Sequence, residues 1–404
     1  MALSPITKRR IQTFKANRRG YVAFIILVVL FVFSLLSEFI ANDKPLLVYY
    51  KGQILTPIFH TYIERDTFGG DLESATDYAD PWVRQEIDKN GWMMMPLLKY
   101  DYRSIAFDVT RAPSPPTTRN PLGTDDQARD VLARVMYGFR LSMIFALLLV
   151  SLSSAVGITL GAISGYFGGF FDLFFQRFLE IWHGIPVLFL LIILSSMVVP
   201  NFWWLLGLML LFSWMALVDV VRAEFLRARN FDYVRAARAL GVPELTIMRR
   251  HVLPNAMVSV FTFLPFMITG AIGTLTSLDF LGFGLPIGSP SLGELLAQGK
   301  NNPQSPWLGL VGFFTLAILM SLWLFMGEAV RDAFNPRKIF IRSEDGGEPP
   351  KPPRSPDGSG SRRKALRTNQ TSEESRVASH GEPRSEGVSV AKGDLPPSSE
   401  RNNP

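Results

Sequence analysis

The histidines of this 404-residue chain stand far apart, and the chain contains no cysteine. They are His60, His183, His251 and His380, and neither an HExxH pair nor a Cys/His ligand spacing is present. The sequence therefore predicts no metal site of a familiar kind. Without cysteine there is also no disulfide framework, no iron–sulfur site and no thiol nucleophile.

Nucleotide and nucleic-acid chemistry are not indicated either. The sequence has no G-x-x-x-x-G-K-[ST] phosphate-binding loop, so we do not expect it to bind ATP. Its net charge of +6 is explained by basic loops beside apolar segments, and no nucleic-acid recognition motif is present. A membrane-embedded hydrolase would need a nucleophile with its base, or paired carboxylates, and His183 has no evident partner.

Three ionisable residues lie at or near the ends of long apolar runs. Arg177 and Glu180 are three residues apart, so they share a helical face and can form an ion pair. Asp279, in the stretch "SLDFLGFG", lies deep enough to be a candidate for a substrate path. Its carboxylate could meet a substrate amine or line a gate; alternatively, it could face the interface or pair with a neighbour.

A basic segment between two apolar runs reads "YVRAARALGVPELTIMRRHVLPNA" and covers 233–256. Its alanine-rich first part favours a helix, Gly241 is suited to cap that helix, and Pro243 helps to prevent its continuation. A second helix is expected from Glu244 to the Leu-Pro pair that ends at Pro254. Such a helix–turn–helix could dock on another protein through its small residues, or lie on lipid headgroups through its arginines.

The elements that position these residues are predicted to be membrane spans, because several apolar runs approach the roughly 20 residues that cross a bilayer. We predict six spans, at 21–40, about 141–163, 172–199, about 202–221, from about 256, and from 307 to about 326. Basic residues gather in the first twenty residues, in the quoted segment and after the last span. This excess places all three on the cytoplasmic side.

The predicted fold is that of an all-α polytopic membrane protein with both termini cytoplasmic. A basic cytoplasmic N-terminus (1–20) precedes the first transmembrane helix (21–40), and an extracytoplasmic lobe with a pre-span helix follows (41–139). Residues 140–335 form a core of five transmembrane helices with a cytoplasmic loop at 222–255. The tail, 343–404, has no aromatic residue and is rich in Pro, Gly and Ser, so we expect it to be disordered.

The quoted segment resembles the EAA loop of ABC importer permeases. The residues that match the spacing of that motif are Ala236, Ala237, Gly241, Leu253 and Pro254. Two further stretches are similar to dipeptide and oligopeptide permeases, namely "NPLGTDDQARDVLARVMYGFRLSM" at 120–143 and the region from "FLGFGLP" to "EAVRDAFNPR". The resemblance covers roughly 10–340, and the long segment with "NDKPLLVYY" is most similar to the microcin C and peptide uptake subtype.

That resemblance implies a type I ABC importer permease fold and one half of a pore for peptides in the bacterial inner membrane. The partners it implies are a second homologous permease subunit, two ATPase domains and a periplasmic peptide-binding protein, besides the lipid bilayer and the peptide. ATP and magnesium would be bound by those partners and no cofactor by this chain. The residues it implies in coupling to the ATPases are Tyr233, Arg235, Ala236, Ala237, Gly241, Leu253 and Pro254.

The segment departs from the motif at two positions, where Arg235 replaces the motif's Glu and His251 its Ile. Because Arg235 reverses the usual charge, either the ATPase presents an acid to it or it lies on the rim of the contact. The rim is favoured, because the face of Ala236 and Ala237 can make the close contact without it.

A second functional class remains open beside the ATP-driven importer. A secondary transporter or channel subunit would not depend on ATPases. Transporters of that kind commonly show inverted repeats and ion-binding polar groups near the midplane. The sequence shows no internal repeat and has few carboxylates within its apolar runs.

Overall fold

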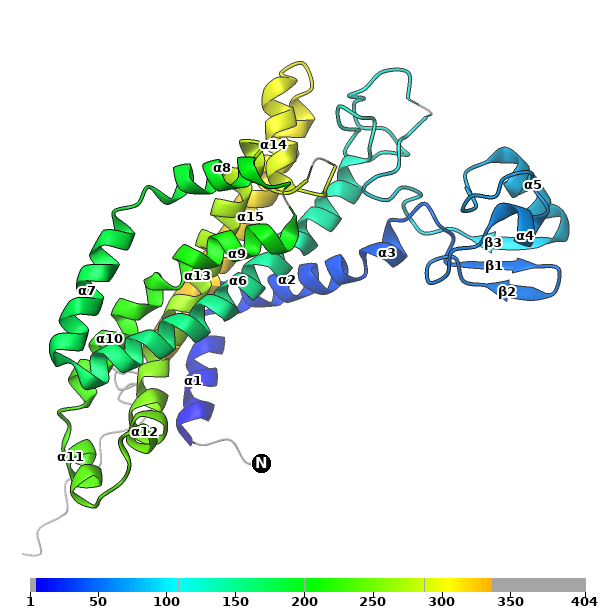
Figure 1. The fold of residues 1–404 in the computed structure, drawn as a ribbon. Helices are drawn as coiled ribbons and strands as arrows, with labels where there is room; N and C mark the ends of the chain where they lie inside the picture. Colours follow the sequence, from blue (N-terminus) through cyan, green and yellow to red (C-terminus); the bar gives the residue numbers. More distant parts are fainter. Residues whose placement is uncertain (1–4, 108, 200, 287, 336–404) are drawn as a thin grey trace, which may run out of the picture. The chain divides into compact units, whose positions relative to one another are not determined.

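The computed structural model describes residues 5–107, 109–199, 201–286 and 288–335. Helices dominate this part of the chain, and strands are confined to one short region (Figure 1). The predicted disordered tail at 343–404 lies outside the described residues.

In the described part of the chain, five helical segments are long and apolar enough to cross a membrane. They are α2 (Arg18–Leu35), α6 (Val131–Phe167), α9 (Phe202–Ser213) with α10 (Met215–Ala228), the segment Glu244–Phe280 that ends in α13 (Leu253–Phe280), and α15 (Pro306–Phe334). A sixth span results if the bent pair α7 (Gly169–His183) and α8 (Val187–Met197) crosses as one unit. The predicted polytopic helical architecture is therefore confirmed.

The third predicted span, 172–199, is not a single helix. α7 and α8 are bent by 70° relative to each other, and the break between them contains Gly184 and Pro186. Proline lacks the N–H group that a continuing helix requires, and it disfavours helical geometry in the residue before it. The prediction of one helix is wrong because it followed the apolar run across this proline.

The second and sixth spans are longer than predicted. α6 begins at Val131 rather than near 141, and the carboxylate of Asp130 caps it by accepting the N–H of Ala133 at 2.8 Å. α15 continues to Phe334, beyond the predicted end near 326. Both predictions followed apolar character, whereas the helices extend into polar sequence where capping and packing still favour them.

The helix after the turn of the basic loop does not stop at Pro254. α12 (Glu244–Ile247) passes through a π-helical turn, η1 (Met248–Val252), directly into α13. A proline within a helix needs room for its ring, and the wide π-helical turn just before Pro254 provides it without ending the helix. The predicted boundary between this loop helix and the fifth span is therefore wrong, because both belong to one continuous segment.

α6 and α10 pack with their backbones close together. Gly157, Gly161 and Gly165 recur at every fourth position and so lie on one face of α6. A Cβ atom at any of them would lie only 2.4–2.7 Å from a carbonyl oxygen of α10 or of Trp214, the residue that precedes it. Larger residues are therefore excluded, and small residues are what allow transmembrane helices to approach this closely.

The basic N-terminal residues form a helix of their own, α1 (Pro5–Ala16), which the sequence analysis did not predict. It ends at Asn17, whose side-chain oxygen accepts the N–H of Gly20 and caps α2. The amide of Asn17 also donates to the carboxylate of Asp332 in α15 at 3.3 Å. α1 and α2 are therefore both held against α15.

The segment after α2 and the short α3 (Ser37–Ile40) contains a sheet that the all-α prediction did not include. Its strands are β1 (Leu47–Tyr50), β2 (Gln53–Leu55) and β3 (Gly91–Met94). They are antiparallel and lie in the order β2-β1-β3. Two short helices, α4 (Glu64–Phe68) and α5 (Pro81–Asn90), lie between β2 and β3 in the chain. Val48 and Tyr50 point into a buried cluster, whereas Tyr49 and Trp92 stack on the exposed face. Strands of three or four residues are too short for alternation to reveal them in the sequence.

Candidate functional site

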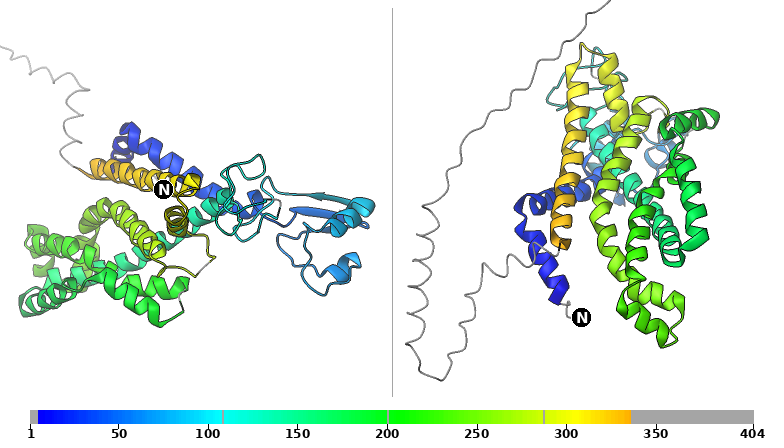
Figure 2. Two further views of the ribbon diagram at one scale, coloured as in Figure 1. Left: turned by 90° about the horizontal axis from the view of Figure 1, so that it is seen from above. Right: turned by 90° about the vertical axis from the view of Figure 1, so that its left-hand side faces the viewer.

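The basic loop joins α10 to α13 and lies at the end of these helices that is remote from α14 (Leu292–Asn301) (Figures 1 and 2). Its first helix is α11 (Asp232–Ala239). The N–H groups of Gly241 and Val242 donate to the carbonyls of Arg238 and Ala237, at 3.0 and 3.1 Å. Gly241 has a φ of +75°, a left-handed conformation that glycine adopts without strain. The predicted cap at Gly241 is confirmed.

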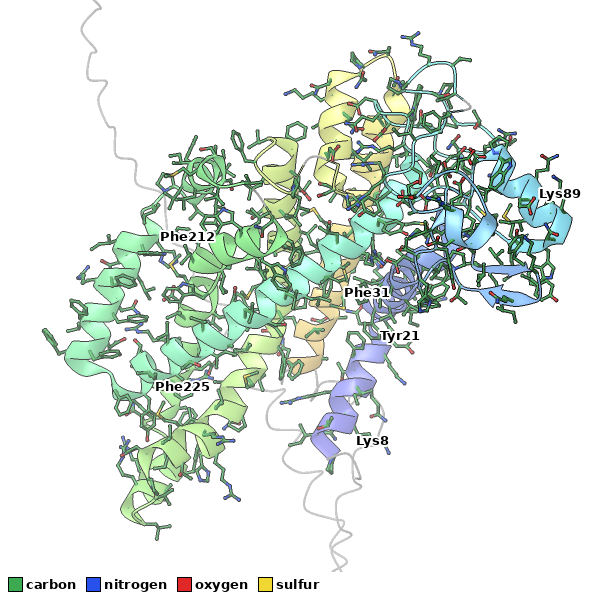
Figure 3. All side chains as sticks on the ribbon, turned by 45° about the vertical axis from the view of Figure 1, so that its right-hand side comes forward. Lys8, Tyr21, Phe31, Lys89, Phe212 and Phe225 are labelled. Carbon is green, nitrogen blue, oxygen red and sulfur yellow. The ribbon has the colours of Figure 1, made fainter. Side chains whose placement is uncertain are left out.

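The inner face of the loop packs on the ends of the spans. Val234, Ala237 and Ile247 are buried in one cluster with Phe225, which is labelled on α10 in Figure 3. The expectation that Ala236 and Ala237 together form an outward contact face is therefore wrong for one of them. Ala236 is exposed, but Ala237 is only 9% exposed and supports the loop from within.

The outer face of the loop exposes both apolar and cationic side chains. Leu240 and Leu245, on either side of the turn, are 83% and 74% exposed. Arg235, Arg249 and Arg250 of the same loop are also exposed. Large apolar residues exposed on a polar loop are typical of surfaces that bind a protein partner. We call Leu240, Gly241 and Leu245 the loop tip.

The remaining residues of the predicted coupling set differ in their surroundings. Tyr233 is exposed, and its hydroxyl accepts a hydrogen bond from the amide of Asn255 at 3.3 Å. Pro254 is also exposed, whereas Leu253 is half-buried and packs on the inner cluster. The structure therefore brings the seven predicted residues into one loop, some of them outward and some of them inward.

Three side chains connect the loop to the end of α6. Tyr166 donates its hydroxyl to the carboxylate of Glu244, which also accepts from Arg238 Nε at 2.7 Å. Arg238 Nη2 donates to the Tyr166 hydroxyl at 3.3 Å. Tyr166 is buried, whereas Arg238 and Glu244 are about half exposed. This Tyr166 brace thus joins the helices on both sides of the turn to a buried point on a span.

A second set of contacts connects the same ends of four spans. Asp172, at the start of α7, accepts from Arg222 of α10 at 2.6 and 2.7 Å and from the Ser164 hydroxyl of α6 at 2.5 Å. The Ser259 hydroxyl of α13 donates to Glu224 of α10 at 2.7 Å. These contacts therefore link the base of the loop to α6, α7, α10 and α13.

Asp279 lies at the other end of α13. One carboxylate oxygen accepts the Ser291 hydroxyl at 2.5 Å, and the other accepts the N–H of Leu285 at 2.7 Å. Gly284 packs so closely that a Cβ there would lie 1.8 Å from the same carboxylate. Both carboxylate oxygens therefore bond to groups in the turn between α13 and α14. This agrees with the alternative interpretation, in which Asp279 pairs with a neighbour. A role of Asp279 in the substrate path stays a prediction.

A buried ionic cluster in the 120–143 stretch was not singled out from the sequence. Arg129 donates to Asp125 at 2.7 Å and to Glu294 of α14 at 3.1 Å, and Arg134 donates to Glu294 at 2.9 Å. Asp125, Arg129 and Arg134 are all at least 96% buried, so each charge must be paired to be tolerated. The cluster fastens the beginning of α6 to α14.

The other predicted chemistry can be placed as well. Arg177 and Glu180 form the predicted ion pair at 2.6 Å, and both side chains are exposed. Among the described residues, no three His, Asp or Glu side chains lie close enough together to hold a metal ion. His380 lies outside the described residues.

Some of these features left a signal in the sequence and others did not. The G-x-x-x-G-x-x-x-G stripe at 157–165 can be predicted from the sequence, because spacing alone places the glycines on one helical face. The Tyr166 brace cannot be predicted in this way, because Tyr166 is far from Glu244 in the chain and only the packing of α6 beside α10 brings them together. The same holds for Arg134 and Glu294.

Residues 157–340 match the family model described as "binding-protein-dependent transport system inner membrane component". The matched range contains the whole loop, both of its flanking helices and the contacts that brace it. The 120–143 stretch and the sheet-containing region lie before it.

Curated relatives extend the similarity over most of the chain. The chain is 58% identical over 337 residues to the inner membrane ABC transporter permease protein YejE of Escherichia coli strain K12, covering 83% of this chain and 98% of that protein. It is 56% identical over 362 residues to the peptidoglycan transport system permease protein YejE of Agrobacterium fabrum, covering 83% and 94%. The oligopeptide transport system permease protein OppC of Lactococcus lactis subsp. cremoris is 35% identical over 231 residues, covering 56% and 78%. With its helical spans and its braced loop, the chain belongs to the family of binding-protein-dependent transport system inner membrane components, the permeases of ABC transporters.

Proposed function

We propose that this permease is one half of the pore of an ATP-driven importer that carries peptides, including peptides attached to other groups. The support for the substrate class is the names of its relatives, which transport oligopeptides or peptidoglycan, a polymer that contains short peptides. A secondary transporter or channel that works without ATPases has no support in these relatives or in the family.

The observation that carries the proposal is the architecture of the loop. Its tip exposes two leucines and its inner face is buried on the span ends. An ATPase subunit could bind the tip by covering those leucines, while the surrounding arginines meet acidic groups at the edge of the contact. A partner bound at the tip would therefore contact an element that packs directly on the ends of the spans.

Movement of the tip has two routes into the spans. The first is the continuous helix from Glu244 through η1 into α13, which transmits displacement along its axis. The second is the Tyr166 brace, which pulls on the end of α6. Closure of two ATPase subunits around ATP would therefore displace α6 and α13 together, and these helices also contact each other.

We assign ATP hydrolysis, the second half of the pore and peptide delivery to partner subunits. Because the sequence has no phosphate-binding loop, ATP and magnesium belong to two ATPase domains. A second homologous permease would complete the pore, and a periplasmic binding protein would deliver the peptide. The loop and both termini would face the cytoplasm, since basic residues gather there.

Co-purification with the ATPase subunits tests this proposal. The chain is co-expressed with its partner subunits, and the tip variant Leu240→Asp/Leu245→Asp is compared with Leu72→Asp/Leu97→Asp, which changes two exposed leucines between β2 and α6. We expect the tip variant to lose the ATPase and ATP-dependent uptake of labelled peptide, while the control keeps both. Retention of the ATPase by the tip variant would show that the loop tip is not the docking surface.

A further inference from the structure

A cavity of about 900 Å³ lies between α1, α10, α13 and α15, at the end of the helices that carries the loop. It adjoins the point where α10 turns into the loop, because Ala228 and Phe231 line it. The transport mechanism derived above makes no use of this cavity.

Four arginines line this cavity. Arg9 and Arg10 come from α1, Arg227 from α10 and Arg331 from α15. One carboxylate, Glu224, also lines it, but Glu224 is already paired with Arg227 and accepts the Ser259 hydroxyl. Within the described part of the chain, no ion pair involves Arg9, Arg10 or Arg331. The cavity therefore has a positive charge that its own carboxylate does not neutralise.

Apolar side chains also line the cavity. Val258 comes from α13 and Phe334 from α15. The ring of Phe334 is held between the guanidinium of Arg10, 4.6 Å from its centroid, and the stacked ring of Phe261. Cationic and apolar side chains therefore line one cavity, and an anionic phospholipid has a charged headgroup and acyl chains that complement the two kinds of group.

The composition of α1 and its position before a span also suit a phospholipid. α1 precedes a span and carries Lys8 and Lys15 besides its two arginines, so it has the composition of a helix that lies at the surface of an anionic membrane. Figure 3 shows Lys8 on α1 and Tyr21 near the start of α2. The bond between Asn17 and Asp332 holds the end of α1 beside α15.

We propose that this cavity binds an anionic phospholipid, with its phosphate among Arg9, Arg10 and Arg331 and an acyl chain along Val258 and Phe334. Basic pockets between transmembrane helices on the cytoplasmic side are suited to such headgroups. Because α10 and α13 both line the cavity and both enter the loop, an occupied site would stiffen the base of the loop. The proposal concerns lipid binding and does not depend on which substrate is transported.

Native mass spectrometry of the full chain, purified and delipidated in detergent, tests the site. Phosphatidylglycerol, cardiolipin and phosphatidylcholine are titrated against the natural protein and against Arg9→Gln/Arg10→Gln/Arg331→Gln. The matched control is Lys8→Gln/Lys15→Gln/Arg19→Gln, which removes the same charge from the same region without touching the cavity. We expect the cavity variant to bind the anionic lipids at least about tenfold more weakly, because three cationic contacts are lost, and the control to bind like the natural protein.

Each other outcome contradicts the proposal in its own way. An equal loss in both variants would show diffuse attraction to the basic region in place of a site. Equal binding of phosphatidylcholine would show that charge is not recognised. If inorganic phosphate competes as well as short-chain phosphatidylglycerol, the cavity takes a free anion and not a lipid. Thermal unfolding without added lipid checks that both variants are folded.

Discussion

At the scale of single residues, the loop depends on one backbone conformation and on which side chains point outward. Gly241 reverses the chain with a positive φ, and the hydrogen bonds of Gly241 and Val242 end α11 there. Side chains on the two sides of the reversal then have separate tasks. Ala237 and Ile247 are buried and support the loop from within, whereas Leu240 and Leu245 are exposed.

Gly241→Val is expected to disturb this reversal. A β-branched residue at φ +75° is strained by about 1–2 kcal/mol, so the turn should shift or open. We expect the variant to reach the membrane in normal amount but to retain less ATPase on purification, or to hydrolyse ATP without importing peptide. Gly207→Val, on an exposed face of α9 with open space around it, is the control. Normal peptide uptake by Gly241→Val would remove Gly241 from the coupling mechanism.

Substitutions of Arg235, Ala236 and Ala237 test whether each residue lies at the rim of the proposed docking surface, at its centre, or beneath it. An exposed charge pair contributes about 0–1 kcal/mol, so Arg235→Ala should change ATPase co-purification little. Ala236→Trp should abolish docking, because it fills exposed space next to the tip. Ala237→Trp should instead lower the melting temperature of the permease, because its side chain enters the inner cluster. If Arg235→Ala alone releases the ATPase, Arg235 makes a desolvated pair, which loses about 2–5 kcal/mol on truncation.

At the scale of elements, the loop is joined to two spans, α13 and α6, in different ways. α13 is continuous with α12, so its connection is covalent and helical. α6 is not continuous with the loop. It is connected through the side chains of the Tyr166 brace and through its close packing on α10. Each connection can therefore be weakened without the other.

Tyr166→Phe tests the side-chain connection. The variant keeps the buried ring and loses only the hydroxyl that bonds to Glu244 and Arg238. We expect ATPase docking to persist while the amount of peptide imported per ATP hydrolysed decreases. Tyr78→Phe is a matched control, because it also removes one hydroxyl from a buried tyrosine, in the sheet-containing region and outside the brace. An unchanged ratio of transport to hydrolysis would show that α13 alone transmits the motion.

Gly161→Ala tests the packing of α6 on α10. The added methyl would lie 2.7 Å from the carbonyl oxygen of Val218, so the helices must separate. Overpacking of this kind costs about 1–3 kcal/mol, and we expect a lower unfolding temperature in detergent. Gly270→Ala, where the Cβ position is open, should leave that temperature nearly unchanged. Equal melting of the two variants would mean that the stripe tolerates a methyl group.

At the scale of the whole molecule, the arrangement of spans decides what the loop can reach. The loop and α1 lie at one end of the helices, and α14 lies at the other (Figures 1 and 2). The Asp279 turn is bonded to Ser291, directly before α14, and the ionic cluster is bonded to Glu294 within it. If the bent α7–α8 pair is counted as one span, the chain has six spans. An even number of crossings puts the start of the first span and the end of the last span on the same side of the membrane.

Labelling from opposite sides of the membrane tests this topology. Cysteines are introduced near residues 75 and 240 of the cysteine-free chain and are treated with an impermeant thiol reagent in intact cells. We expect labelling near 75 in intact cells and labelling near 240 only after the membrane is opened. Accessibility of both positions from the same side would exclude six spans with a cytoplasmic loop.

The sequence by itself determined the features that depend on spacing along one helix or turn. Apolar runs specify spans because about 20 residues must cross the bilayer. The cap at Gly241 and the ion pair of Arg177 with Glu180 follow from local geometry in the same way. The tertiary structure alone decided that Ala237 faces inward and that Tyr166 meets Glu244. Such contacts join residues far apart in the chain, and only the packing of helices against one another determines which of their faces are covered.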